Sequence, residues 1–338
     1  MKIRINNKTF FYFNNFAVQL NLDSVASSFS FIARFNPDNK DHKILFKPLS
    51  YPKIEVFKND DTLLLTGVIV DHVFNSDQNP HLVKLSGYSL GGVLEDSTIP
   101  YAAYPLESIN RSLKDISRRL LKLFNLSLII DINVLIDANL IYPKSVASPA
   151  ESVQSYLSKL TSQRNIVMSH DIKGDIVYFR LNTISTPKIF FNTQNTVKMR
   201  FSITGQGLHD EITVIRQPSK ENNNLSPVDT IKNPLINAFR PRVKTLSSGT
   251  DTDTAKAADN ALASELKHLR LTIMIPRWED LWPGDLVEVQ NEEIYIYKRT
   301  KFIIKSITLG ENEKSNTMSL SVVLPEAYTG KQPKNIFA

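Results

Sequence analysis

The sequence predicts a β-rich α+β protein made of three successive segments. Strand-like alternation dominates residues 1–100, and no long helix is expected before Asn110. Helical spacing follows, and strand patterning returns after about residue 186. The 338 residues show no β-α-β alternation and no repeat, so we expect two or three domains rather than one doubly wound sheet.

The first segment is expected to consist of hairpins. "KIRINNKTFFYF" predicts a turn around Asn6-Asn7-Lys8, and "KIEVFKNDDTLLLTGVIVDHVF" predicts one at residues 58–61. Apolar and polar residues alternate over Ser28–Phe35, which indicates a half-buried strand. "HLVKLSGY" completes the set of predicted strands.

The middle segment is expected to be a small α+β unit. A helix is predicted from Asn110 to Phe124, with leucines and Ile116 on one face. The opposite face carries four basic residues: Arg111, Lys114, Arg118 and Lys122. "SPAE", residues 148–151, has the form of a capping box with proline at the first helical position, so a second helix is expected to begin there. A hairpin turning at Lys173-Gly174 follows.

The last segment reads as strands with one helical interruption. The predicted strands are "KIFFN", "VKMRFSITGQG", "RLTIMIP", "DLVEVQN", "IYIYKRTKFIIKSITLG" and "TMSLSVVLP". A helix is expected from Asp253 to Leu269, because acids precede it and Lys267, His268 and Arg270 close it. "RQPSKENNNLSPVDTIKNP" is expected to be a mobile loop.

Composition excludes several classes of function. The chain has no cysteine, which excludes disulfides, thiolate catalysis and cysteine-ligated metals. Asp131 and Asp137 interrupt the most apolar stretch, Leu123–Tyr142, so we expect a soluble protein with no membrane insertion. The net charge of +6 permits nucleic-acid contact without requiring it.

The pentapeptide GYSLG, residues 87–91, fits the G-x-S-x-G nucleophile elbow of serine hydrolases and makes Ser89 a candidate nucleophile. An elbow needs a buried parallel strand before the serine and a full helix after it. Here the preceding strand exposes Lys84, and Pro100 leaves little room for a helix. We therefore expect Gly87 and Gly91 to be structural turn residues and assign no catalytic residue.

Other possible sites are also better explained as turns. "GQGLHD" lacks the third glycine of a dinucleotide-binding motif, so Gly205 is expected to be a turn residue. The pairs His170-Asp171 and His209-Asp210 have no third ligand at metal-site spacing. No metal or cofactor is therefore predicted.

An acidic stretch leaves an enzymatic alternative open. Glu279, Asp280 and Asp285 surround a turn that is expected at Pro283-Gly284. Paired carboxylates can cleave glycosidic bonds, and spacing alone does not exclude such a role.

The basic face of the predicted 110–124 helix has two interpretations. It could bind phosphates, although no aromatic residue is interleaved for base stacking. The simpler interpretation is a solvated helix face. We keep Arg111, Lys114, Arg118 and Lys122 as a candidate partner-docking face.

Several segments together resemble the baseplate hub proteins of contractile phage tails, closest to the Mu-like (late control protein D-like) hub. The similarity covers nearly the whole chain and follows the same order. The segments are "IEVFKNDDTLLLTGVIVDHV", "VKLSGYSLGGVLEDSTIP", "SPAESVQSYLSKLTSQRNIVMSHDIKGDIVYFR", "FRPRVKTLSSGTD" with the alanine-rich helix, "LTIMIPRWEDLWPGDLVEV" and "MSLSVVLPEAY".

This resemblance implies two related β-barrel domains and a ring-forming hub. The first barrel would cover residues 1–100, an inserted α+β domain 101–185, and the second barrel 186–330, with a helical insertion at about 252–269 and a tail at 331–338. Three copies would form a ring of six barrels that matches a sixfold tail tube to a threefold membrane-piercing spike. Ser89 would then be structural, at the exit of the first barrel.

The function implied by the resemblance is that of a non-enzymatic adaptor in a virion tail baseplate, assembled in the host bacterial cytoplasm. The expected partners are two further copies of the chain, the spike protein, the tube or tube-initiator protein and other baseplate proteins. DNA would only pass through the lumen, whose wall should then be neutral or acidic. The alternatives are a tail-associated peptidoglycan hydrolase that uses Glu279, Asp280 or Asp285, and a nucleic-acid binder.

Overall fold

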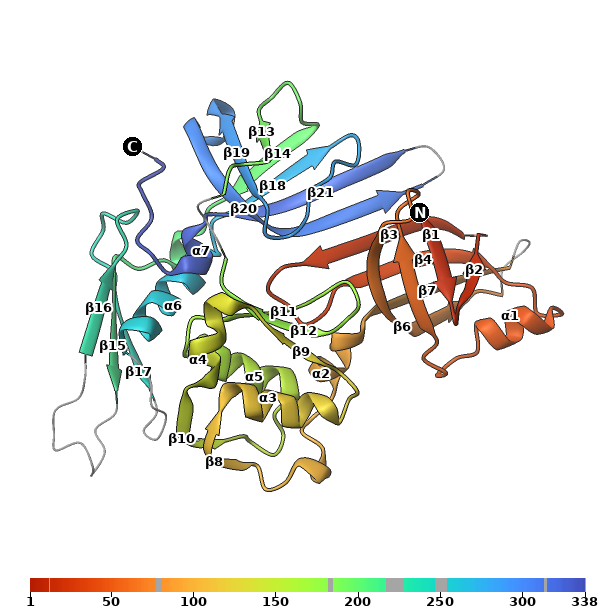
Figure 1. Cartoon of the computed structure of the whole chain (residues 1–338). Helices are drawn as coiled ribbons and strands as arrows, with labels where there is room; N and C mark the ends of the chain where they lie inside the picture. Colours follow the sequence, from red (N-terminus) through yellow and green to blue (C-terminus); the bar gives the residue numbers. More distant parts are fainter. Residues whose placement is uncertain are drawn as a thin grey trace.

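The computed structural model describes residues 1–11, 13–76, 81–181, 185–216, 228–246, 254–312 and 315–337. Its main body is a sheet of 13 strands that combines the first and last thirds of the chain (Figure 1). The middle third forms a separate α+β lobe below this sheet in the same view. The β-rich α+β fold class predicted from the sequence is confirmed.

The first block of the sheet is formed as the hairpin patterns predict. Asn6 and Asn7 both have positive φ, 46° and 64°, as a two-residue hairpin turn with right-handed strand twist requires. The only helix described in this block, α1 (Lys40–Leu45), has no buried residue. The strands are β1 (Lys2–Ile5), β2 (Lys8–Phe10), β3 (Phe13–Asn21), β4 (Ser28–Arg34), β5 (Lys53–Phe57), β6 (Leu63–Phe74) and β7 (Leu82–Ser89).

The second block is joined to the first through one long strand, β20 (Ile296–Glu311). β20 pairs with β3 over Ser306–Glu311 and with β19 over its earlier residues. Its companions are β13 (Ile189–Phe191), β14 (Lys198–Ser202), β18 (Arg270–Ile275), β19 (Leu286–Asn291) and β21 (Asn316–Val323), with α7 (Glu326–Thr329) after them. One hydrophobic core contains residues of both blocks, so the expected barrels share a ladder and a core.

The inserted lobe has its own core, which includes Leu113, Val134, Leu157 and Tyr178, with Val25 of the first block. Its helices are α2 (Val93–Asp96), α3 (Leu113–Lys122), α4 (Leu135–Asn139) and α5 (Val153–Ser162), with one-turn 3-10 helices η1 (Leu90–Gly92), η2 (Tyr101–Ala103) and η3 (Ile132–Val134). Its strands are β8 (Glu107–Ser112), β9 (Leu128–Ile130), β10 (Ile141–Val146), β11 (Val167–His170) and β12 (Ile176–Phe179). The domain boundaries given above stay a prediction.

Both predicted helix starts in this lobe were too early. α3 begins after Ser112, whose hydroxyl accepts a hydrogen bond from the Asp115 amide at 3.1 Å, because residues 107–112 pair with β10 as a strand. α5 begins after Ser152, which caps the Ser155 amide at 3.1 Å. The predicted capping box instead closes a turn, in which Glu151 accepts from the Ser148 amide.

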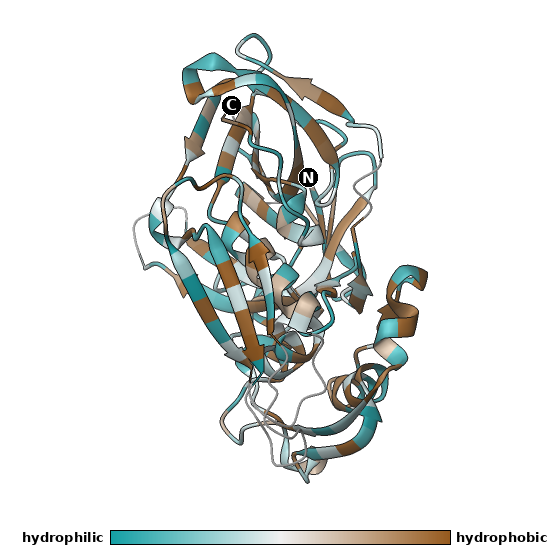
Figure 2. Ribbon diagram, turned by 90° about the vertical axis from the view of Figure 1, so that its left-hand side faces the viewer, coloured by the Kyte–Doolittle hydropathy of each residue, from teal (hydrophilic) through white to brown (hydrophobic). Residues whose placement is uncertain are grey.

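A second insertion, between β14 and β18, is larger than the sequence predicts. Besides α6 (Thr254–Leu266) and η4 (Gly205–Gly207), it holds a three-stranded sheet of β15 (Glu211–Arg216), β16 (Val228–Lys232) and β17 (Pro241–Leu246). β16 and the turn after it occupy part of the segment that was expected to be a loop, and residues 217–227 of that segment lie outside the described part of the chain. Asp253, the predicted start of the helix, also lies outside it. Ile212 and Val214 of β15 are buried beside α6. The three strands lie on the left of Figure 1, the side that faces the viewer in Figure 2, where hydrophilic and hydrophobic residues both occur along them.

Gly87 and Gly91 serve close packing rather than turns. Gly87 lies inside β7, where an added Cβ would be 2.0 Å from the Val68 carbonyl oxygen on β6. Gly91 lies in η1, where a Cβ would be 2.1 Å from the Val25 carbonyl oxygen. The GYSLG sequence therefore brings the chain against two neighbouring backbones at the exit of the first block.

The other predicted turn residues differ in their steric needs. Gly284 has a φ of 96°, which side chains rarely adopt, and it follows Pro283 in a turn where the Asp285 carboxylate accepts from the Trp282 amide at 2.7 Å. At Gly205, by contrast, no described atom lies within 4 Å of an added Cβ. None of the helices formed by the described residues is both long and apolar enough to cross a bilayer.

Gly87→Ala is expected to lower the free energy of unfolding by about 1–3 kcal/mol, because the β6 backbone has to move to admit a methyl group. Gly205→Ala is the matched control, and its effect should stay within about 0.5 kcal/mol. Denaturant unfolding followed by circular dichroism measures both. Equal stability of the two variants would contradict the packing assigned to Gly87.

Candidate functional site

The candidate nucleophile Ser89 is buried and its hydroxyl is occupied. Its Oγ accepts a hydrogen bond from the Ser27 amide at 2.9 Å, and its own amide donates to the Ser27 carbonyl at 2.8 Å. The side chain is 1% exposed. Ser89 thus ties the end of β7 to the start of β4, and its hydroxyl does not face solvent.

The three acidic candidates do not share a cleft. Asp285 caps its own turn, pairs with Lys188 at 2.8 Å and lines a hollow of about 550 Å³. Glu279 pairs with Arg277 at 2.6 Å and lines a different hollow of about 280 Å³. The Asp280 side chain is 88% exposed. This arrangement lacks the pair of facing carboxyl groups that glycoside cleavage needs.

The histidine–aspartate pairs hold loops together. The His170 imidazole contacts the Ser24 carbonyl at 3.0 Å, and Asp171 accepts from the Lys173 and Asp175 amides in the hairpin turn. Burial lowers the pKa of His170 below its usual 6.5. In the part of the chain that the structure describes, no three His, Asp or Glu side chains gather as a metal site would require.

His209 belongs to a different cluster, centred on the buried Glu265 of α6. The Glu265 carboxylate accepts from the His209 amide at 2.9 Å and lies 2.7 Å from its Nδ1. Arg242 of β17 donates to the same carboxylate at 2.9 Å. Asp210 instead accepts from the Arg240 amide at 2.6 Å. These contacts fasten the end of α6 to the small sheet of the second insertion.

The candidate docking face divides between two elements. Lys114, Arg118 and Lys122 follow one another at four-residue spacing along α3, whereas Arg111 lies on β8. Lys114 donates to the Asn139 side chain of α4 at 3.3 Å, and Arg118 and Lys122 are exposed. The docking role of these residues stays a prediction.

One polar cluster is a site that the sequence did not indicate as a whole, although His170 was considered singly. It lies where the first block, the inserted lobe and the second block meet, and we call it the three-way junction: Asp23, His170, Lys267, Lys305 and Tyr328. Asp23, in the turn between β3 and β4, accepts from Lys267, which directly follows α6, at 2.7 Å and lies 3.8 Å from Lys305 of β20. Lys267 also lies 4.6 Å from the Tyr328 ring of α7.

Electrostatics at the junction favour an ionised Asp23. Burial by itself would raise the pKa of this carboxyl, but attraction by Lys267 and Lys305 outweighs burial and holds the pKa below 3.8. Burial, and then repulsion by Lys267 and Arg270, lower the pKa of Lys305 against the pull of Asp23. At the junction, one carboxylate, that of Asp23, therefore faces two lysine side chains, and all three groups are partly buried.

Further contacts hold the inserted lobe against the second block. Asp137 of α4 lies 3.1 Å from Lys256 of α6, and it is also held 2.9 Å from Arg180, which follows β12 within the lobe. Asn165 donates to the Thr329 carbonyl of α7 at 3.2 Å. The Asp137–Lys256 and Asn165–Thr329 contacts span 119 and 164 positions of the sequence, and they set how the lobe lies on the body.

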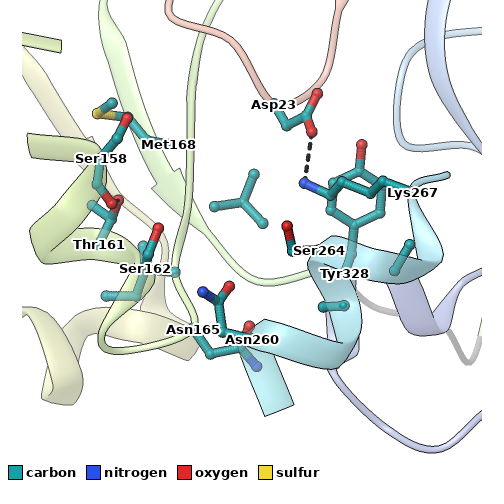
Figure 3. A pocket seen from close by; sticks show the side chains of 14 residues that line it. Asp23, Ser158, Thr161, Ser162, Asn165, Met168, Asn260, Ser264, Lys267 and Tyr328 are labelled. Carbon is teal, nitrogen blue, oxygen red and sulfur yellow. Dashed lines mark hydrogen bonds and ion pairs between the residues drawn. The ribbon is translucent and has the colours of Figure 1, made fainter. Parts of the chain in front are cut away.

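A small polar cavity of about 190 Å³ opens between these contacts (Figure 3). Side chains of α5 line one side and side chains of α6 and α7 the other, with Asp23 and Lys267 joined by an ion pair at its rim. The labelled lining residues are Asp23, Ser158, Thr161, Ser162, Asn165, Met168, Asn260, Ser264, Lys267 and Tyr328. Its walls offer hydroxyl and amide groups, which suit water better than an apolar ligand.

The sequence offered little signal for this junction. Asp23 and Lys267 are 244 positions apart, and neither stands in a recognisable motif. The one available hint was the basic end of the predicted 253–269 helix, which was attributed to the helix dipole.

Asp23→Asn is expected to lower the free energy of unfolding at pH 7 by about 1–3 kcal/mol, because Lys267 and Lys305 lose their counter-ion. The folded-state pKa of Asp23 is depressed, so its contribution is complete above the unfolded pKa and disappears as the pH falls through the folded pKa. The difference between wild type and variant should therefore shrink below about pH 4.

Denaturant titrations at a series of pH values measure this difference, with the exposed Asp38→Asn as the control. A difference that stays constant down to the lowest pH would contradict an ionised Asp23 at the junction.

Comparison with solved structures places this fold among phage tail proteins. The sequence matches no family model and no curated protein. The structure resembles the 43 kDa tail protein of prophage MuSo2 from Shewanella oneidensis, with a TM-score of 0.76, 17% identity, and 97% of this chain and 98% of that one covered. The tail protein of Neisseria meningitidis MC58 gives a TM-score of 0.77 at 19% identity, with 97% of both chains covered.

A type VI secretion protein also shares the fold. An E. coli component of that system, described as structurally similar to T4 bacteriophage tail proteins, gives a TM-score of 0.58 at 12% identity, covering 99% of this chain and 80% of that one. The predicted resemblance to tail hub proteins is thus confirmed at the level of the fold: this chain has the fold of phage and prophage tail proteins.

Proposed function

We propose that this protein is a structural hub of a contractile phage tail or a related injection machine. The observation that carries the proposal is the similarity to a prophage tail protein and to the tail protein of Neisseria meningitidis, over 97% of this chain and nearly all of theirs. Agreement over such a length includes both sheet blocks, the inserted lobe and their order. The proposed place of action is the tail baseplate of a virion or prophage particle.

A homotrimer is the proposed working form. Each protomer contributes two sheet blocks, so three protomers present six blocks to a sixfold tube and three equivalent surfaces to a threefold spike. The β20–β3 ladder and the shared core support this proposal, because an adaptor must hold its two blocks at a fixed angle. Spike, tube or tube-initiator, and other baseplate proteins are the proposed partners.

A mechanical rather than an enzymatic role fits the candidate sites best. Ser89 is buried, and the three carboxylates Glu279, Asp280 and Asp285 do not converge in one cleft. The peptidoglycan hydrolase therefore has less support than the hub. DNA is proposed only to pass through the ring, and a basic lumen wall would oppose this passage.

Light scattering on a sizing column tests the trimer. We expect a mass of three 38.3 kDa protomers that persists, or forms, as concentration rises through a dilution series. Negative-stain electron microscopy of that fraction should show a ring. A monomer at every concentration that remains clear would contradict self-assembly of the hub.

Purified cell walls should keep their turbidity in the presence of the protein, because its carboxylates are not arranged for glycoside cleavage. Asp285→Asn is the control for this assay. Clearing by the wild type that is lost in Asp285→Asn would replace the hub with the hydrolase. Clearing that Asp285→Asn retains would be tested again with Glu279→Gln and Asp280→Asn, and loss in either variant would likewise replace the hub with the hydrolase. Only clearing that all three variants retain would indicate a contaminating enzyme.

A further inference from the structure

The turn between β3 and β4 of the first block is inserted into the α+β lobe. Val25 of this turn is fully buried and belongs to the hydrophobic core of the lobe. The neighbouring Ser24 contacts two side chains of the lobe. Its carbonyl oxygen lies 3.0 Å from Nδ1 of His170, and its hydroxyl donates to Glu95 at 3.3 Å. The turn therefore fastens the lobe to the first block, partly through an imidazole.

The contact with Ser24 determines where the proton of a neutral His170 lies. A carbonyl oxygen only accepts hydrogen bonds, so Nδ1 carries the proton and Nε2 carries none. The ring stands at the end of β11 and lines the hollow of about 550 Å³, whose wall includes Leu22 and Trp282. Protonation of Nε2 would place a full positive charge in this partly apolar site, which is costly unless a counter-ion is close.

The carboxylates on the side of the hollow are bound to other groups. Among the described residues that line it, the titratable ones besides His170 are Asp171 and Asp285. Asp171 accepts from two backbone amides of its own turn, each at 2.9 Å. Asp285 pairs with Lys188 at 2.8 Å. Neither carboxylate makes a hydrogen bond to the imidazole.

The charged groups on the side of the β3–β4 turn do not supply a counter-ion either. Asp23 precedes Ser24 in the chain, and it binds Lys267 at 2.7 Å and lies 3.8 Å from Lys305. Glu95 accepts from the Ser24 hydroxyl. A protonated His170 would therefore have two lysines and no unoccupied carboxylate on this side.

The balance of these effects disfavours a charged His170. Burial, the largest effect, lowers the pKa of His170 below 6.5, while the Ser24 carbonyl and the charge of Asp171 raise the pKa by less. An imidazole that leaves the site regains its ordinary pKa. The closed arrangement thus binds fewer protons than the open one between these two pKa values. It is fully favoured above 6.5 and weakens as the pH falls from there to the folded-state pKa.

We propose that His170 and the Ser24 carbonyl form an acid-sensitive latch, which holds the lobe on the first block at neutral pH and releases the β3–β4 turn on mild acidification. Each opening takes up at most one proton at this site, so the ratio of open to closed molecules rises by at most about tenfold per pH unit. The Asp23 ion pair responds only below about pH 4, which separates the two effects. The latch goes beyond the proposed hub function and does not depend on it.

A thiol in the turn measures the opening. The chain has no cysteine, so Val25→Cys introduces a single one at a side chain that is fully buried. Its rate of reaction with 4,4′-dithiodipyridine is divided by that of the exposed Lys40→Cys at each pH from about 8 to about 5, which corrects for the thiolate fraction. We expect this rate ratio to be constant above about pH 7 and to rise, by up to about tenfold per unit, as the pH falls below 6.5.

His170→Gln, combined with Val25→Cys, removes the titration, while its side-chain amide can still donate to the Ser24 carbonyl. Its rate ratio should stay constant over the whole pH range. The matched control is His72→Gln. Burial also lowers the pKa of His72, but this residue lies in β6 of the first block, where its ring stacks on Phe74. The His72→Gln variant should keep the rise at low pH.

Two further measurements keep the test independent of one reporter. Ser169→Cys replaces Val25→Cys if the latter does not fold, because Ser169 is 5% exposed and lines the same hollow. In the cysteine-free chain, the free energy of unfolding should fall more steeply below pH 6.5 in the wild type than in His170→Gln. The circular dichroism spectrum should remain native at about pH 5.5, because the opening is local.

Four results would overturn the proposal. The first is a rate ratio that stays constant with His170 in place. The second is an equal rise in His170→Gln, and the third is a rise that disappears in His72→Gln. The fourth is loss of the native circular dichroism spectrum over the same pH range, which would show acid unfolding of the whole chain rather than release of one turn.

Discussion

The β20–β3 ladder is the contact on which the other parts of the structure depend. β20 spans 16 residues, and it pairs with β19 of its own block before it continues beside β3 of the first block. The ladder closes the chain on itself, because Phe16 and Glu311 become partners. Without it the two blocks would share neither a sheet nor a core, and the three-way junction would have no fixed walls.

The inserted lobe is oriented by polar contacts rather than by a sheet. The contact of His170 with the Ser24 carbonyl connects it to the first block, and Asp137 with Lys256 and Asn165 with α7 connect it to the second. Ion pairs of this kind contribute little net stability, since desolvation offsets much of the attraction. They do demand specific partners at specific distances, and so they hold the lobe in one position.

The architecture supports a function that depends on shape and symmetry. The motif that suggests catalysis in the sequence has a structural role in the fold: the Ser89 hydroxyl accepts a hydrogen bond from the Ser27 amide. The features that remain are surfaces, chiefly the two joined sheet blocks. In the proposed trimer every partner contact would be repeated around an axis, so such surfaces would carry the function.

The sequence by itself determined the order of segments, the hairpins and the existence of the major helices, because alternation and turn residues act over a few positions. Asn6-Asn7 is an example, where two neighbouring asparagines at positive φ form the turn that the local sequence predicts. Only the tertiary structure decided where α3 and α5 begin, that β16 is a strand, and that Asp23 meets Lys267. These depend on pairing and desolvation between segments far apart in the chain, which no local pattern records.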